Sequence, residues 1–394
     1  MLVPANADDY RQLAKKRLPK QFFDYLEGGS YNEHTAQANI TAFNNVQLRQ
    51  RVLQDVSKRS SAHQLLGKPV AMPIALGPVG LAGLFARRGE VQAARAASAA
   101  GIPFCESTVS LCSIEEVAAA SKGELWFQLY MLKDRGYAKE LLERAHTCGI
   151  EVLVFTVDLA VLGARYRDTR NGIAGAQGFR AGLARARDLL SHPRWLVNVA
   201  IKGKPLVFGN LQAAVPNAKS LPAFKHWVDQ QFDDSVTWQD LEWVRQHWPG
   251  KIMLKGILDA SDASIAADMG FSAIAVSNHG GRQLDSVPAT IHALPAIVDA
   301  VAGRCEVLVD GGIRSGLDVV KALALGANGC LLGRAWAYAL AAQGEQGVTN
   351  LMATFKAEID VAQALTGCTT IAQINRDIVI ANNGWSETTK KFSK

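Results

Sequence analysis

The residues best suited to chemistry follow one short apolar segment, in the run Asn278-His279-Gly280-Gly281-Arg282. A neutral imidazole such as that of His279 can accept a proton near physiological pH. Arg282, three residues later, can bind a carboxylate through two parallel hydrogen bonds. Asp158 ends another apolar segment and could orient the imidazole and stabilise its protonated form, although an aspartate there could equally cap a helix. These residue types suit the removal of a proton from a substrate that carries an acid group.

Further polar residues end or follow other apolar segments: Ser107, Gln128, Tyr130, Thr156 and Lys255. A lysine at the end of a buried segment is costly unless it meets a partner, such as the developing negative charge of a cofactor. The other side chains could face the same centre as His279. Each of them alone could equally be a hydrogen-bonded polar group of the core.

Glycine together with arginine follows two more apolar segments, in Asp310-Gly311-Gly312-Ile313-Arg314 and in Gly333-Arg334. Glycine lets backbone N–H groups approach an anion closely, and arginine supplies positive charge. One such pair would indicate no more than a tight turn. Their coincidence on two successive segments favours a phosphate-binding site.

Several common sites are absent from the sequence. No two of the 34 glycines are separated by a single residue, which excludes the dinucleotide-binding and kinase glycine patterns. Metalloprotease and EF-hand patterns are missing as well, and the six cysteines form no CxxC pair, so we predict no metal site. The first residues contain no apolar signal segment, and prolines and glycines interrupt the longest uncharged run, 69–86.

Eight short apolar segments recur along the chain and are separated by amphipathic stretches. The segments are Met72–Leu76, Pro103–Cys105, Leu125–Leu129, Val152–Val157, Ile252–Lys255, Ala273–Ser277, Glu306–Val309 and Gly329–Leu332. The helix-like stretches include Gly89–Ala100, Gly136–Cys148, Ser261–Met269 and Leu317–Leu325, each followed by a glycine that can end a helix. Unalternating strands joined by helices predict an α/β fold, a TIM (β/α)8 barrel, whose catalytic residues lie where the strands end.

Two stretches do not fit the repeat. Residues 1–70 precede the first strand, and we expect them to form a mostly helical cap over one end of the barrel. The connection between strands four and five is far longer than a helical crossover requires. Its last part, Ser235–Trp248, is typical of a barrel helix, whereas residues 169–220 are predicted to be an insertion or lid. The whole chain, 1–394, would form a single domain.

The motif Ser277-Asn278-His279-Gly280-Gly281-Arg282-Gln283-Leu284-Asp285 resembles the active-site signature of the FMN-dependent α-hydroxy-acid dehydrogenases and oxidases. The resemblance covers nearly the whole chain. It includes Tyr25-Leu26-Glu27-Gly28-Gly29, Pro78-Val79-Gly80, Trp126-Phe127-Gln128-Leu129-Tyr130, Thr156-Val157-Asp158, Lys255-Gly256, Asp310-Gly311-Gly312-Ile313-Arg314 and Leu332-Gly333-Arg334. A chance match of all these motifs in order is negligible.

The resemblance implies a role for each matching residue. His279 would take a substrate proton, Asp158 would support its charge, and Tyr130 would bind the substrate hydroxyl. Arg282 would bind the carboxylate, with Tyr25 and Arg165 assisting. The residues implied to bind FMN are Ala75, Pro78, Ser107, Gln128, Thr156, Lys255, Asp310, Gly311, Gly312, Arg314, Gly333 and Arg334.

Within the family, Gly163-Ala164-Arg165-Tyr166-Arg167-Asp168 is most similar to the bacterial respiratory L-lactate dehydrogenases. This implies oxidation of L-lactate to pyruvate, with electrons passed to a quinone at the cytoplasmic face of the inner membrane, and a homo-oligomer, by resemblance a tetramer. The alternatives are an (S)-mandelate dehydrogenase and an oxidase that uses O₂. The sequence leaves open whether the electrons leave as hydride or after removal of the α-proton.

The net charge of +6 is concentrated in one region: residues 165–219 carry +8, and the rest of the chain sums to −2. Basic residues alternate there with apolar ones such as Leu189, Leu190 and Trp195. This pattern suits peripheral contact with anionic lipid, and a solvated lid over the active site is the alternative. A nucleic-acid-binding protein is a further alternative that would not explain the His279 motif, so we expect no nucleic-acid partner.

Overall fold

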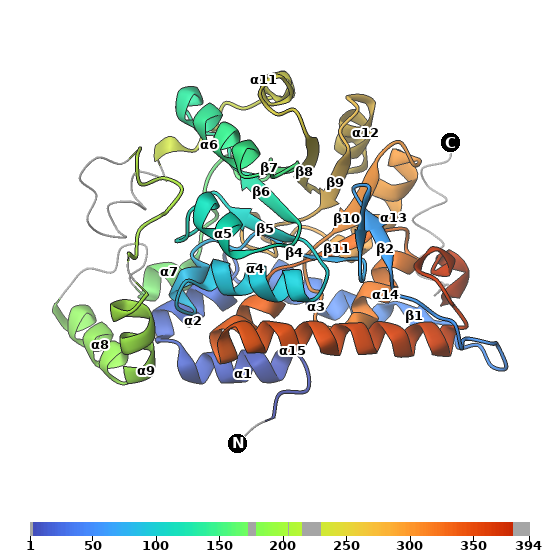
Figure 1. The fold of residues 1–394 in the computed structure, drawn as a ribbon, viewed down its shortest axis with the longest axis horizontal. Coiled ribbons are helices and arrows are strands. Elements are labelled where there is room, and N and C mark those ends of the chain that lie inside the picture. The colour runs from blue at the N-terminus through green and yellow to red at the C-terminus, as the bar shows by residue number, and fades with distance from the viewer. Residues whose placement is uncertain (1–2, 172–178, 204, 215–229, 381–394) are drawn as a thin grey trace.

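A computed structural model of the chain describes residues 3–171, 179–203, 205–214 and 230–380. Its centre is a closed barrel of eight parallel strands in chain order (Figure 1). The strands are β4 (Ile74–Leu76), β5 (Phe104–Ser107), β6 (Leu125–Leu129), β7 (Val152–Thr156), β8 (Lys251–Ile257), β9 (Ala273–Val276), β10 (Glu306–Val309) and β11 (Gly329–Leu332). The last strand pairs with the first, with Cys330 opposite Ile74, which closes the barrel. The predicted TIM barrel is confirmed.

Some strand boundaries differ from the prediction: β4 begins at Ile74 instead of Met72, and β8 runs from Lys251 to Ile257 instead of from Ile252 to Lys255. At β5 the difference comes from buried polar residues. β5 continues to Ser107, two residues beyond the predicted end, because Glu106 and Ser107 belong to the strand although they are polar. Both are almost fully buried. Since the strands were recognised by their apolar residues, a buried polar residue at the end of a strand made the predicted strand too short.

Helices surround the barrel and connect its strands. They are α4 (Gly89–Ala99), α5 (Ile114–Ala120), α6 (Arg135–Thr147), α11 (Asp240–His247), α12 (Ala260–Asp268), α13 (Thr290–Val301), α14 (Gly316–Ala324) and α15 (Arg334–Thr366), with short turns η2 (Ala82–Leu84), η4 (Ile371–Gln373) and η5 (Arg376–Ile378). The four predicted helices agree within one residue at either end. The glycines after them, such as Gly101 and Gly149, have positive φ and end the helices.

The helix predicted over Ser235–Trp248 begins later, at Asp240. Ser235 bonds instead to Asp233 Oδ1 through both its backbone N–H and its hydroxyl group. The backbone N–H of Thr237 bonds to Asp240 Oδ2. These local side-chain bonds satisfy the backbone in a turn, which competes with helix formation.

The N-terminal segment is helical as far as Asn45, in α1 (Ala7–Arg17), α2 (Lys20–Glu27), α3 (His34–Thr41) and η1 (Ala42–Asn45). α1 lies along α15, at the bottom of the view in Figure 1. The prediction of helix is wrong for residues 46–70, which contain short strands instead. β1 (Gln47–Leu48) pairs with β12 (Val379–Ile380), and β2 (His63–Leu65) forms a hairpin with β3 (Lys68–Val70). Leu65, Leu66 and Val70 join the cluster of apolar residues inside the barrel. The hairpin therefore covers the barrel interior.

The long connection between β7 and β8 carries α7 (Tyr166–Asn171), α8 (Phe179–Leu190), α9 (Pro193–Trp195) and the π-helical turn η3 (Leu196–Ile201). Trp195 fastens this part to the rest of the molecule, because its indole N–H donates to the carbonyl of Leu84 at 2.7 Å and its ring stacks on Phe22. Residues 172–178, 204 and 215–220 of the predicted insertion lie outside the described residues.

Candidate active site

The strands end at a cavity of about 620 Å³. Its lining includes many of the predicted site residues: Tyr25, Pro78, Tyr130, Thr156, Arg165, Lys255, His279, Arg282, Asp310, Gly311, Gly312, Arg314, Gly333 and Arg334. The barrel thus brings together residues that lie hundreds of positions apart in the chain. Ala75, Ser107 and Gln128 are buried within the barrel and are not among the described lining residues.

His279 and Asp158 form a close pair beside this cavity. His279 Nδ1 lies 2.9 Å from Asp158 Oδ1. Burial lowers the pKa of His279, and the nearby carboxylate of Asp158 only partly offsets this effect. Burial raises the pKa of Asp158, but the opposing charge and hydrogen bond of His279 bring it below its ordinary value. The pair is therefore a neutral imidazole beside a carboxylate at neutral pH. If Nδ1 donates to Asp158, then Nε2 is the proton acceptor.

Lys255 is a buried cation in β8, two residues before the strand ends. Its Nζ lies 2.8 Å from Asp310 Oδ2 and donates to Ser277 Oγ at 2.9 Å. Burial lowers the pKa of Lys255, but the carboxylates of Asp310 and Asp158 raise it by more than burial lowers it. The pKa of Lys255 is therefore above its ordinary value. Lys255 is therefore charged, and it places a positive charge in the cavity wall.

A row of polar side chains crosses three neighbouring strands. The hydroxyl of Ser107 donates to Gln128 Oε1 at 3.1 Å, and Gln128 Nε2 donates to Thr156 Oγ1 at 3.0 Å. Thr156 lines the cavity, so the row connects the cavity wall with β5 and β6. These contacts orient Thr156 and satisfy the buried amide of Gln128.

Two arginines and two tyrosines surround the part of the cavity beside His279. The guanidinium group of Arg282 lies 4.8 Å from the ring centre of Tyr25. Burial, and to a smaller extent the positive charge of Arg282, lowers the pKa of Arg165 to about 10. Arg165 is therefore still protonated at neutral pH. Burial raises the pKa of Tyr130, whose hydroxyl therefore keeps its proton. Two cations and a hydroxyl donor suit a small carboxylate that carries a neighbouring hydroxyl group.

The residues at the ends of β10 and β11 fit the FMN that the resemblance implies. Asp310 Oδ1 is buried without a hydrogen-bond partner in the part of the chain that the structure describes, so it can accept a hydrogen bond from a ligand hydroxyl. Arg314 and Arg334 line the same cavity and can meet a phosphate. A Cβ at Gly333 would meet no atom of the described residues within 4 Å, which leaves space beside Arg334 for a ligand.

Two glycines near the site, Gly281 and Gly312, have a further reason for lacking a side chain. A Cβ at Gly312 would lie 1.9 Å from the carbonyl oxygen of Asn39, and one at Gly281 would lie 2.5 Å from the backbone nitrogen of Ala36. Both contacts are with α3. These glycines therefore permit close packing of the N-terminal cap, which the sequence alone could not reveal.

Two other residues of the nine-residue motif also bind the cap. Asn278 and Asn39 exchange side-chain hydrogen bonds of 2.8 and 2.9 Å. Asp285 accepts from the backbone N–H groups of His34 and Thr35 at the start of α3. Asn278 and Asp285 therefore anchor the loop that carries His279 and Arg282 to α3.

Several lining residues carry no signal that sequence reasoning could use. They are apolar side chains on separate loops and helices, among them Phe22, Phe85, Val109, Phe208 and Phe232. Phe232 packs against Tyr130 with ring centres 5.0 Å apart. An isolated apolar residue in a connecting segment is indistinguishable from a core residue until the fold places it.

Comparison with known proteins agrees with this geometry. A profile of the FMN-dependent dehydrogenase family matches residues 14–381. An L-lactate dehydrogenase of Chromohalobacter salexigens is 50% identical over 383 residues, which are 97% of each chain. An L-lactate dehydrogenase of Xanthomonas oryzae pv. oryzae is 52% identical over 377 residues, 96% of each chain.

Solved structures are similar over nearly the full length as well. The crystal structure of a monotopic membrane protein, (S)-mandelate dehydrogenase, matches with a TM-score of 0.90 and 39% identity over 97% of this chain and 100% of that one. A mandelate oxidase matches with a TM-score of 0.81 and 39% identity, covering 94% of this chain and 97% of the other.

Proposed function

The chain belongs to the FMN-dependent dehydrogenase family, and from this premise we propose that it oxidises L-lactate to pyruvate. Relatives that share half of its residues over nearly the full length carry the name L-lactate dehydrogenase. The observation that carries the proposal is the His279–Asp158 pair beside Arg165 and Arg282 in one cavity. A base beside two cations suits a 2-hydroxy acid.

The reaction converts the C–OH group of the substrate into C=O, with loss of two electrons and two protons. FMN, when bound, would supply the oxidising power for this two-electron step. Arg282 and Arg165 bind the substrate carboxylate, and Tyr130 binds the hydroxyl oxygen. Nε2 of His279 takes a substrate proton, and Asp158 stabilises the resulting imidazolium.

The chain's own residues also hold the cofactor. We assign Arg314, Arg334 and the backbone at Gly333 to the phosphate, and Asp310 to the ribityl hydroxyls. Ser107, Gln128, Thr156, Ala75 and Pro78 support the ring system. Lys255 supplies positive charge in the cavity, which favours the reduced, more negative cofactor.

An absorption spectrum of the purified protein tests the proposal directly. We expect a flavin spectrum that L-lactate bleaches in the absence of air, and slower bleaching by (S)-mandelate. Faster bleaching by mandelate would favour the alternative that the structural relatives suggest. A protein that neither contains nor binds FMN would refute the proposal.

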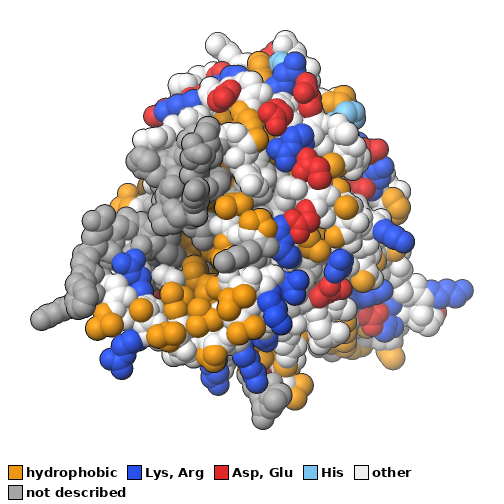
Figure 2. All heavy atoms as spheres, turned by 60° about the vertical axis from the view of Figure 1, so that its left-hand side comes forward, with side chains coloured by type: hydrophobic (Ala, Val, Ile, Leu, Met, Phe, Trp, Pro, Cys, Tyr) orange, Lys and Arg blue, Asp and Glu red, His pale blue; other side chains and the backbone are white. Residues whose placement is uncertain are grey.

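For the electron acceptor we propose a quinone in the inner membrane, reached from the cytoplasmic face. Leu183, Leu190 and Ile201 of the insertion are 54%, 71% and 64% exposed. Figure 2, turned to bring this side forward, shows hydrophobic side chains gathered on this face with Lys and Arg side chains around them. Such a surface suits peripheral contact with anionic lipid. No helix among the described residues is long and apolar enough to cross a membrane.

Vesicle binding tests the membrane contact. The wild-type protein is expected to sediment with vesicles of phosphatidylcholine and phosphatidylglycerol, and less so at high salt. Leu190→Glu together with Ile201→Glu should abolish sedimentation. Ile265→Glu, at an exposed isoleucine on α12, is the matched control and should leave it unchanged. Binding that survives the double variant would favour a lid. Reduction of a short-chain quinone, compared with O₂, then identifies the acceptor.

We further propose that the protein is a homotetramer, an assembly implied by the family resemblance. Sedimentation equilibrium of the holoenzyme should give four times the chain mass of 42.4 kDa. A monomer mass would contradict it.

A further inference from the structure

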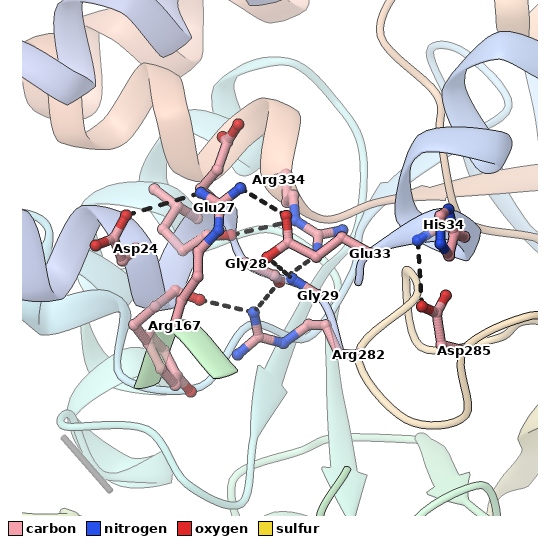
Figure 3. Close-up of polar contacts among 12 residues, drawn as sticks. Asp24, Glu27, Gly28, Gly29, Glu33, His34, Arg167, Arg282, Asp285 and Arg334 are labelled. Carbon is pink, nitrogen blue, oxygen red and sulfur yellow. Dashed lines mark hydrogen bonds and ion pairs between the residues drawn. The ribbon is translucent and has the colours of Figure 1, made fainter. Parts of the chain in front are cut away.

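Arg167 is a charged residue of α7 that the proposed reaction does not use. Its Nη2 lies 2.5 Å from Glu33 Oε2, and its Nη1 lies 3.7 Å from Asp24 Oδ1. Figure 3 shows Arg167 reaching both carboxylates, which belong to α2 and to the residue before α3. The side chain therefore links the start of the insertion to the N-terminal cap.

Arg167 also contacts the backbone of the loop formed by residues 28–33. A Cβ at Gly28 would lie 3.4 Å from Arg167 Cδ, so the aliphatic part of the arginine packs over this glycine. The second oxygen of Glu33, Oε1, accepts from the backbone N–H of Gly29 at 3.2 Å. The guanidinium group thus holds the carboxylate that in turn holds the first half of the loop.

The same part of the chain carries the carbonyl groups that orient two arginines of the cavity, Arg282 and Arg334. The carbonyl oxygen of Gly28 accepts from Arg282 Nη1 at 2.8 Å and from Arg334 Nη2 at 2.7 Å. The carbonyl of Tyr25 accepts from the same Arg282 nitrogen at 2.6 Å. Figure 3 shows Arg282 and Arg334 converging on Gly28. A shift of this loop would therefore move the acceptors that set the direction of Arg282.

The second half of the loop is held independently. The backbone N–H of Ser30 donates to the carbonyl of Gly281 at 2.8 Å, and that of Tyr31 donates to the carbonyl of Ala164 at 2.7 Å. Asp24 also forms an ion pair with Lys20, which does not involve Arg167. Loss of Arg167 should therefore displace the Gly28 carbonyl without unfolding the cap.

We propose that Arg167 is a positioning residue for substrate binding: through Glu33 and Gly28 it fixes the carbonyl that orients Arg282. The inference rests on the proposed function, because it requires Arg282 to bind the substrate carboxylate. Arg167 itself does not touch the substrate. It acts on the strength of carboxylate binding and leaves the proton transfer to His279 unchanged.

The test compares Arg167→Met with Arg170→Met in the holoenzyme. Arg170 lies on the same helix, and its guanidinium group lies over the exposed ring of Tyr166, so its variant removes the same charge away from the loop. We expect Arg167→Met to raise the KM for L-lactate about tenfold, with kcat within about twofold of wild type. The dissociation constant of oxalate, an unreactive dicarboxylate followed by flavin absorption, should rise by the same factor. Arg170→Met should change neither.

Two further variants separate positioning from general stability. Arg167→Lys should recover part of the affinity, because an ammonium group can still reach Glu33 but lacks the second arm. Glu33→Gln should raise KM in the same direction. The double variant Arg167→Met/Glu33→Gln should have a KM no higher than that of the more impaired single variant, because both substitutions remove the same contact.

An unchanged KM and oxalate affinity in Arg167→Met would overturn the inference. The inference would also fail if Arg167→Met lowered both kcat and the melting temperature but left KM unchanged. An equal rise of KM in Arg170→Met would overturn it as well. A wild-type protein without flavin or without activity toward 2-hydroxy acids would instead reject the proposed function. The two failures are therefore distinguishable.

Discussion

At the scale of single residues, His279 and Asp158 lie 121 positions apart in the chain and 2.9 Å apart in space. Asp158 Oδ2 is buried without a hydrogen-bond partner among the described residues, so the carboxylate is directed mainly at the imidazole. This environment keeps His279 neutral and ready to take a proton, and it supplies a negative charge that stabilises the protonated form.

Replacing the base tests its role. His279→Gln should retain FMN and lower kcat by about 10²–10⁴-fold, the usual contribution of a general base. The flavin spectrum and the steady-state rate with L-lactate provide the measurement. His146→Gln, at an exposed histidine of α6, is the control and should keep the wild-type rate. A near-normal kcat in His279→Gln would remove His279 from the mechanism.

The pH profile follows from the lowered pKa of His279. Because the neutral imidazole is the active form, kcat/KM should rise with pH through a pKa below the ordinary value of about 6.5. Asp158 raises the pKa of His279, so Asp158→Asn should move this acid limb to still lower pH and also reduce kcat. Measured profiles in which the limb moves to higher pH in Asp158→Asn would contradict the assignment.

At the scale of elements, the buried residue Asn210 fastens the later part of the insertion to the barrel. Asn210 accepts from the backbone N–H of Ile114 at 2.8 Å and donates to the carbonyl of Ser107 at 3.2 Å. Its own carbonyl accepts from the hydroxyl of Tyr137 at 2.6 Å. Phe208, two residues earlier, lines the cavity. Asn210 therefore fixes the part of the insertion that forms the cavity wall.

A change of this asparagine to an acid should destabilise the protein in a pH-dependent way. Asn210 Nδ2 lies 3.5 Å from Glu106, whose pKa is raised well above its ordinary range by burial and by Glu90. In Asn210→Asp, a second carboxyl group replaces this donor, and the repulsion grows as pH rises and the acids lose their protons. The melting temperature should therefore fall further below wild type at pH 8 than at pH 5. In Asn210→Ala the deficit should be about the same at both pH values; an equal deficit for Asn210→Asp would contradict the argument.

At the scale of the whole molecule, the site is complete only when the cap packs on the barrel. α3 touches the strand-end loops at Gly281 and Gly312, where no Cβ would fit. The loop after α2 supplies the carbonyls that hold Arg282 and Arg334. The cap is therefore part of the active site, and loosening it should weaken both cofactor and substrate binding.

Gly312→Ala tests this dependence. A Cβ there would lie 1.9 Å from the carbonyl oxygen of Asn39, and φ is +89°, so α3 must move. Hydrogen exchange should become faster in α1–α3 than in the barrel strands, and FMN affinity should fall. Gly182→Ala, in α8, is the control: none of the described residues lies within 4 Å of the new Cβ, so exchange and FMN affinity should stay unchanged. Unchanged exchange in Gly312→Ala would show that the cap is not held by this contact.

The sequence by itself determined the barrel, because most strands contain a short apolar run and four of the connecting helices are amphipathic stretches followed by a glycine. These signals are local, so they survive without knowledge of the fold. The same holds for His279 and Arg282, which follow β9, and for Lys255 in the last part of β8, because these positions lie at the end of the barrel where the strands end.

Only the tertiary structure decided what those residues touch. The contact of Arg167 with Glu33, the anchoring of Asn210 and the aromatic wall of Phe208 and Phe232 all join segments that are distant in the chain. At Gly312 a side chain is excluded by α3, which passes directly over it although α3 lies more than two hundred residues earlier in the chain. Such contacts depend on how elements pack, and the residue types of one segment do not encode which other segment will lie against it.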